Sequence, residues 1–174
     1  IAIVIDSPAF FVLTALLSPF MAPVVGLSFA TVLGSGRFAL RMLGGIFTGG
    51  LIIFGWGAVG GLVTRIWPEL AYRQIALHAA FSWPDVVVLV LGASLTAYAL
   101  VRSPQQRPLV TSVAIAYELY LPIGAAGFGL ASGQTQLWPA GLLLFFFHLA
   151  VAALTGAVVL VLLGLKPVSR AGYA

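Results

Sequence analysis

Long apolar runs separated by short polar stretches make up most of the chain. A helix needs about 20 mainly apolar residues to cross the hydrocarbon core of a bilayer. Runs of this kind, bounded by charged residues, Pro or Gly, occupy residues 8–34, 38–64, 85–101, 108–132 and 138–165. The pattern predicts an all-α fold, a polytopic bundle of membrane-spanning helices.

The first and fourth runs contain interior prolines. One reads L-S-P-F-M-A-P up to Pro23 and the other A-Y-E-L-Y-L-P up to Pro122, 99 residues later, and Gly34 and Gly133 have the same spacing. Proline lacks a backbone N–H and interrupts helices, and backbone freed inside a bilayer needs protein or a wet cavity. We therefore expect both segments to be non-helical at mid-bilayer, close together, with a binding site between them.

The first five residues, Ile1–Ile5, are apolar and precede Asp6 without the basic region or cleavage site of a signal peptide. They resemble the end of a helix, so we expect six spans in the full protein, the first truncated here. Because three crossings then separate the two proline-containing spans, the halves would form an inverted 3+3 repeat. The expected single domain, 1–174, divides into half 1 (about 1–66), a connector (67–83) and half 2 (about 84–165).

The connector combines polar and apolar residues. Glu69, Arg73 and His78 are dispersed among apolar side chains, and Trp67 and Trp83 stand at its ends. Tryptophan is enriched at the interface between membrane and water. The pattern predicts a short helix lying on the membrane surface, and a lid over an outer vestibule is the alternative.

Composition agrees with a membrane protein. Hydrophobic residues make up 61% of the chain and charged residues 7%, whereas about a quarter of a soluble domain is charged. The net charge of +4 comes from a few basic residues in loops, so no nucleic acid partner is expected. The absence of cysteine excludes disulfides, cysteine-ligated metals and thiol catalysis.

The basic residues are unevenly divided between the two sides of the predicted bundle. Arg65 and Arg73 fall on one side, and the other six on the opposite side. These six are Arg37, Arg41, Arg102, Arg107, Lys166 and Arg170. The positive-inside rule therefore predicts that the 35–37 turn, the 102–107 loop and the C-terminus are cytoplasmic.

Two regions of the chain resemble a known family. In the first, residues 6–9 (D-S-P-A) and 17–26 (L-S-P-F-M-A-P-V-V-G) are similar to its N-S-P-A and S-P-x-M-G-P-I-x-G motifs. In the second, residues 114–116 (A-I-A), Leu119 and Pro122, followed by 127–133 (G-F-G-L-A-S-G), look like its second conserved-type stretch. The family is the bacterial and archaeal uncharacterised hydrophobic domain, domain of unknown function 389, and the resemblance runs from Asp6 to about Pro167. It implies a prokaryotic multi-helix domain of the inner (cytoplasmic) membrane and supplies no chemistry.

Glu118 lies inside the fourth run, four residues before Pro122. An ionised carboxylate at the bilayer centre costs roughly 2.5–3.5 kcal/mol, so Glu118 should be paired, wet or protonated. It is either a proton- or cation-coupling group or a neutral carboxyl bonded to backbone that the proline frees. The family pattern has a small apolar residue here, Gly at Ala22 and Asn at His148, so a family-wide mechanism would not need Glu118.

His148 lies in the fifth run and is either a partner that reaches Glu118 or a packing residue. Open carbonyls near the first break suit cations, and the N-termini of resumed helices suit anions. The candidate substrate- or ion-binding residues are Ser18, Pro19, Pro23, Tyr117, Glu118, Tyr120, Pro122 and His148. His, Cys and carboxylate residues show no metal-ligand spacing, so neither a metal site nor a cofactor is expected.

Gly45, Gly49, Gly57 and Gly61 share one face of the second predicted span. Small residues at such spacing let helix backbones approach closely. Internal helix packing is the expected role, and the seam of a homodimer is the alternative.

The sequence favours a small transporter-like or channel-like membrane protein whose site lies between the two proline-containing segments. The alternative is a structural or accessory subunit that binds lipid or another membrane protein. No phosphate loop, nucleophile elbow, H-E-x-x-H motif or dinucleotide fingerprint occurs, so no enzyme is expected. The expected partners are the lipid bilayer and, through helix packing, further copies or other membrane proteins.

Overall fold

The computed structural model of the protein describes residues 7–16, 21–67, 73–102 and 109–167. Within these ranges the fold is all-helical, as the apolar runs predict, and contains no β-strand. The helices are α2 (Pro8–Leu16), α3 (Met21–Leu33), α4 (Gly36–Ile66), α5 (Arg73–Leu77), α6 (Trp83–Arg102), α7 (Leu109–Ser132) and α8 (Leu137–Leu162).

Four helices, α4, α6, α7 and α8, are long and apolar enough to cross a membrane. They coincide with four of the five predicted runs, which is consistent with a membrane helix bundle. The remaining run contains α2 and α3, of 9 and 13 residues, and each is shorter than a spanning helix needs to be. Residues 1–5, expected to end a further span, lie outside the described residues.

Proline positions explain where several helices begin. The first turn tolerates proline because its N–H groups have no acceptor within the helix. Prolines in first turns are Pro8 in α2, Pro23 in α3, Pro84 in α6 and Pro139 in α8. Pro23 is therefore helical, so the expectation of a non-helical segment is wrong at this residue. Ser18 and Pro19 lie outside the described residues.

The second expected break is also not a break. α7 continues from Leu109 to Ser132 with Pro122 in its interior, so the expectation of non-helical backbone at Pro122 is wrong. The helix can continue because the carbonyl that Pro122 leaves without a backbone donor receives a hydrogen bond from His148 of α8.

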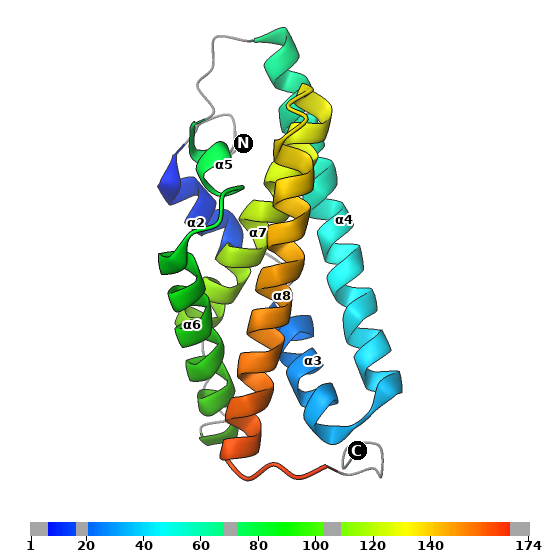
Figure 1. The fold of residues 1–174 in the computed structure, drawn as a ribbon, viewed down its shortest axis with the longest axis vertical. Helices are drawn as coiled ribbons and strands as arrows, with labels where there is room; N and C mark the ends of the chain where they lie inside the picture. The colour runs from blue at the N-terminus through cyan, green and yellow to red at the C-terminus, as the bar shows by residue number, and fades with distance from the viewer. Residues whose placement is uncertain (1–6, 17–20, 68–72, 103–108, 168–174) are drawn as a thin grey trace.

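α7 is the centre of the bundle (Figure 1). In its spanning window 72% of the residues are buried, compared with 28% to 44% for the other three spanning helices. It packs against α4, α8, α6 and α2. α4 rises from the lower end of the bundle and α8 descends from the upper end, so the α3–α4 turn and the ends of α6 and α8 lie together (Figure 1).

Gly34 and Gly133 have the same structural role, in agreement with their equal offset in the sequence. Each directly follows a helix, α3 or α7, and each has a positive φ, 68° and 83°. Glycine adopts this left-handed conformation without the steric cost that a side chain would bring, which makes it the usual residue just beyond a helix C-terminus. Each glycine therefore ends one helix and allows the chain to reverse into the next.

The predicted glycine face of α4 meets two neighbouring helices. Gly57 and Gly61 lie directly against the backbone of α7, where a Cβ would overlap the carbonyl oxygens of Gly124 and Phe128. Gly45 instead lies 3.2 Å, measured from an ideal Cβ, from the ring of Pro23 in α3. Gly49 is buried. Close approach of α4 to α7 thus depends on Gly57 and Gly61.

We expect Gly57→Ala to destabilise the protein by about 1–3 kcal/mol, because the added methyl would force α4 away from the backbone of α7. Gly55→Ala is the matched control, since a Cβ there meets nothing within 4 Å. Unfolding of each purified variant in mixed micelles measures its free energy of unfolding. Equal stability of the two variants would show that the helices do not depend on this close approach.

Candidate functional site

Five polar or ionisable side chains are buried among the described residues, and two of them can ionise. The set is Ser28, Thr96, Ser112, Glu118 and His148. Glu118 retains 7% of its surface and His148 1%. Both lie in helices of spanning length, α7 and α8, where an unpaired charge would be costly.

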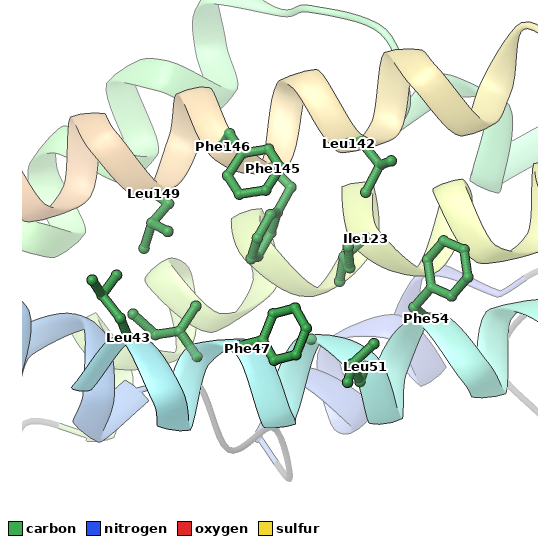
Figure 2. Close-up of a pocket in the computed structure, with 11 residues that line it drawn as sticks. Leu43, Phe47, Leu51, Phe54, Ile123, Leu142, Phe145, Phe146 and Leu149 are labelled. Carbon is green, nitrogen blue, oxygen red and sulfur yellow. The ribbon is translucent and has the colours of Figure 1, made fainter. Parts of the chain in front are cut away.

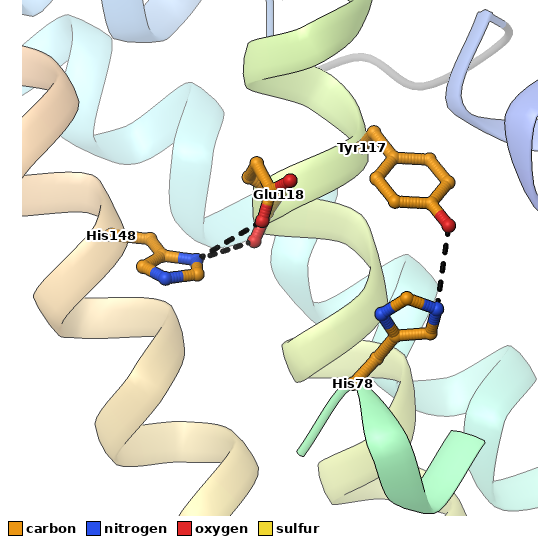
Figure 3. A network of polar contacts seen from close by, with 4 residues as sticks. All are labelled: His78, Tyr117, Glu118 and His148. Atoms are coloured by element: carbon orange, nitrogen blue, oxygen red, sulfur yellow. Dashed lines mark hydrogen bonds and ion pairs between the residues drawn. The ribbon is translucent and has the colours of Figure 1, made fainter. Parts of the chain in front are cut away.

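Glu118 and His148 face each other across the α7–α8 contact (Figure 3). The Nδ1 atom of His148 lies 2.9 Å from the backbone oxygen of Glu118 and 3.8 Å from the carboxylate oxygen Oε2. Because a carbonyl can only accept, Nδ1 must carry the proton of this hydrogen bond. The sequence left open whether the two residues meet, and the structure brings them together.

The backbone bond from His148 compensates for Pro122. In a regular helix the carbonyl of Glu118 would accept from the N–H four residues later, but that residue is proline and has none. The imidazole supplies the missing donor from another helix. Glu118, Pro122 and His148 thus form one unit in which a side chain of α8 maintains the continuity of α7.

The second ring nitrogen of His148 is in an unusual position. Nε2 is buried and finds no hydrogen-bond partner within the described part of the chain. With the proton held on Nδ1, a neutral imidazole presents a lone pair at Nε2. Buried polar atoms normally have partners, and an exception calls for a functional or solvent explanation. The unit therefore contains one basic nitrogen that is able to bind a proton.

Tyr117 leaves α7 on a different side from Glu118 and reaches His78, in the turn after α5 (Figure 3). Its hydroxyl lies 3.3 Å from Nε2 of His78, and the two rings meet edge-on with centroids 5.6 Å apart. Phe11 of α2 contacts the same imidazole edge-on. Tyr120 packs beside the apolar pair Phe11 and Leu121. The two candidate tyrosines therefore lie on the α2 and α5 side of α7.

His78 is a contact residue that sequence reasoning did not select. Burial lowers its pKa below the usual histidine value, and the negative charge of Asp85 acts in the opposite direction. A lowered pKa favours the neutral ring, which can accept a hydrogen bond from Tyr117. Sequence reasoning missed it because His78 and Tyr117 are 39 positions apart, with no helical spacing to connect them.

The expected site between Pro23 and Pro122 stays a prediction, because Ser18 and Pro19 lie outside the described residues. Pro23 contacts Gly45 at the α3–α4 packing, whereas the ionisable pair lies between α7 and α8. A large groove, about 370 Å³ in volume, runs between α4 and α8 over Ile123 of α7, and its lining is apolar throughout (Figure 2). Among the described residues no group of three or more His, Cys, Asp or Glu side chains could hold a metal ion.

Comparison with known proteins identifies the family. Residues 15–161, well over half of the chain, match a family model described as "Domain of unknown function (DUF389)". No curated protein matches the chain, and no solved structure matches it. The match agrees with the resemblance carried by the proline motif near Pro19 and the glycine-rich stretch ending at Gly133, and the chain belongs to the DUF389 family.

Proposed function

We propose that this protein is a small secondary-transporter-like membrane protein in which the Glu118–His148 pair binds and releases a proton. The observation that carries the proposal is the burial of this ionisable pair between two helices of spanning length. Glu118 lies in α7, the most enclosed of them, and Nε2 of His148 in α8 is unpartnered within the described residues. Ionisable residues inside membrane spans are costly, and they commonly mark ion pathways and proton relays.

The geometry supports exchange of a single proton. Nδ1 of His148 is occupied by the backbone of Glu118, so a proton can be held at Nε2 or on the Glu118 carboxyl. With the imidazolium at 3.8 Å from the carboxylate, the pair is neutral overall. Loss of one proton leaves a single negative charge, which a low-dielectric interior disfavours strongly. Binding of a proton and neutralisation of the site are therefore the same event.

An inverted repeat is the second part of the proposal. It relates α3–α4 to α7–α8 by the 99-residue offset already noted at Gly34 and Gly133. The hydroxyl of Ser28 in α3 donates to the carbonyl of Ala153 in α8, at 3.0 Å. At the equivalent positions in α7 and α4, Gly127 lies directly against the carbonyl of Phe54. The contact of α3 with α8 thus has a counterpart in the contact of α7 with α4.

The residues that line the groove between α4 and α8 also support the inverted repeat. Its walls include Leu43, Ile46, Phe47 and Gly50 of α4 and Leu142, Phe145, Phe146 and Leu149 of α8. Each α8 residue lies 99 positions after one of the α4 residues. A pseudo-two-fold axis in the membrane plane would therefore pass through this groove. Repeats of this kind are typical of secondary transporters.

The proposed orientation places the lower end of Figure 1 in the cytoplasm, with the protein in the inner membrane. Arg37, Arg41, Arg102 and Lys166 lie at or just beyond the helix ends gathered there, and Arg65 lies near the opposite end of α4. Loops rich in Lys and Arg are retained on the cytoplasmic side.

Single-cysteine variants provide a clean test of this orientation because the chain has no cysteine. In intact cells a membrane-impermeant thiol reagent should label Gln136→Cys, between α7 and α8, and leave Gly36→Cys, at the start of α4, unlabelled. Permeabilised cells should give labelling of both. Labelling of position 36 and protection of position 136 in intact cells would reverse the proposed topology.

An accessory role is the second candidate, and the contact of His148 with the Glu118 carbonyl favours it. That hydrogen bond needs neither a titratable group nor a substrate, so the pair could serve helix continuity alone. Proton movement distinguishes the two candidates. Protein in vesicles with an entrapped pH dye and a potassium/valinomycin charge shunt should dissipate an imposed pH gradient faster than protein-free vesicles. Equal decay would favour the accessory role.

A further inference from the structure

The groove between α4 and α8 is a candidate binding site separate from the Glu118–His148 pair. α4 and α8 each pack against α7, and they leave between them a channel with Ile123 at its floor (Figure 2). Figure 2 shows Leu43 and Leu149 at one end of the channel and Phe54 and Leu142 at the other. The groove therefore runs lengthwise along part of each of two helices that are long and apolar enough to span a bilayer.

The lining determines the chemistry of an occupant. Every residue that lines the groove is apolar. Water needs two to four polar partners to occupy a cavity stably, and cavities lined by Leu, Ile and Phe stay dry and bind apolar molecules. A polar or charged ligand would lose its hydration here and gain no hydrogen bond from the lining side chains. The groove fits hydrocarbon.

The shape of the groove distinguishes a hydrocarbon chain from a protein helix. Leu43 and Phe54 are 11 residues apart on α4, which at 1.5 Å per residue is about 16 Å. The whole space between the atoms of the groove, its open mouth included, is about 870 Å³, which over that length gives a mean cross-section of about 54 Å². A helix with its side chains is about 10–12 Å wide, about 80–110 Å² in section. A helix of a partner or of a second copy is too wide for the groove, whereas one extended hydrocarbon chain fits.

The rim of the groove is open and the floor is closed. Phe47, Leu51 and Phe146 at the rim are exposed, while Ile123 and Phe145 are buried. The groove lies away from the ends of α4 and α8, so its opening faces the hydrocarbon core of the bilayer. The bilayer therefore supplies apolar acyl chains to the groove at high local concentration.

We propose that the groove binds one acyl chain of a bilayer phospholipid, lying lengthwise between α4 and α8. The acyl chain occupies space that neither helix fills and contacts both α4 and α8. This binding does not depend on proton exchange by the Glu118–His148 pair, because it rests only on the size, lining and position of the groove.

The test uses the full chain in phosphatidylcholine vesicles that contain a small fraction of phosphatidylcholine with a diazirine on one acyl chain. After illumination, peptide mass spectrometry locates the attached lipid. We expect attachment concentrated at the groove residues Phe47, Leu51 and Phe146. Labelling spread evenly over these and other exposed residues, such as Leu62 and Val158, would overturn the proposal.

Blocking variants complete the test. Gly50→Leu places in α4 the side chain that α8 has 99 positions later, and because close-packed space cannot be shared it should lower groove labelling at least about fivefold. Gly55→Leu is the matched control, since its Cβ meets open space, and it should label as the unmodified protein does. Leu142→Trp, at the other end of the groove, gives a second block if Gly50→Leu fails to fold. Undiminished labelling in a folded blocking variant would contradict the proposal.

Discussion

Replacing His148 with leucine is expected to destabilise the protein by about 1–3 kcal/mol, the cost of leaving a buried acceptor without its donor. The acceptor is the carbonyl of Glu118, which Pro122 already deprives of a backbone partner. Leucine fills much of the space of the imidazole, so the loss reports the hydrogen bond more than a cavity. Unfolding in mixed micelles measures the effect.

Two further variants separate the hydrogen bond from packing. The His148→Asn variant would place an amide nitrogen where Nδ1 now lies, so it should recover most of the lost stability. Pro122→Ala returns a backbone N–H to the carbonyl of Glu118, so His148→Leu should cost much less in that background. Coupling between neighbouring residues in such a cycle is typically about 0.5–3 kcal/mol. Additive effects would exclude the compensation of Pro122 by His148.

Glu118→Gln is expected to reduce proton flux in reconstituted vesicles to the protein-free level while the protein stays folded. Glutamine keeps the shape of the side chain and its capacity to hydrogen-bond, but it cannot take up or release a proton. The backbone carbonyl that accepts from His148 is unchanged by the substitution. Decay of an imposed pH gradient, followed with an entrapped dye, measures the flux.

Glu69→Gln is the matched control for this variant, because it makes the same substitution in the 67–83 connector, outside the predicted spans. It should leave the flux unchanged. Full flux in Glu118→Gln would show that the Glu118 carboxyl has no part in proton movement and would contradict its role in the Glu118–His148 pair.

The helices of spanning length were predictable from the sequence for a simple physical reason. Burial in hydrocarbon requires about 20 consecutive apolar residues, and α4, α6, α7 and α8 satisfy this requirement along the chain itself. The ends of α3 and α7 were equally visible, since Gly34 and Gly133 supply the positive φ that a chain reversal after a helix uses. Both features depend on local sequence alone.

The continuity of α7 could not be predicted in the same way. A proline inside a span normally interrupts the helix, so the sequence predicts a break at Pro122. The compensating donor, His148, lies 30 residues after the acceptor, Glu118, so its role depends on how α8 packs against α7. The first-turn position of Pro23 likewise follows from where α3 begins, which the apolar run 8–34 does not reveal.

The two ionisable residues of the candidate site could be predicted from the sequence, whereas the contacts and the groove around them could not. Glu118 and His148 stand out in an apolar sequence because the burial of ionisable groups is costly. The contact of Tyr117 with His78 and the apolar groove over Ile123 both depend on the packing of helices distant in the sequence. Neither has a local signature in spacing or composition.

The protonation of Glu118 can be measured directly by infrared spectroscopy of the reconstituted protein across a pH titration. The chain has four Asp and Glu residues in all, so the difference between the unmodified protein and Glu118→Gln isolates one carboxyl. The account predicts a protonated-carboxyl band that titrates with pH and is missing from the Glu118→Gln spectra. A difference spectrum with no titrating carboxyl band would contradict proton binding by the Glu118–His148 pair.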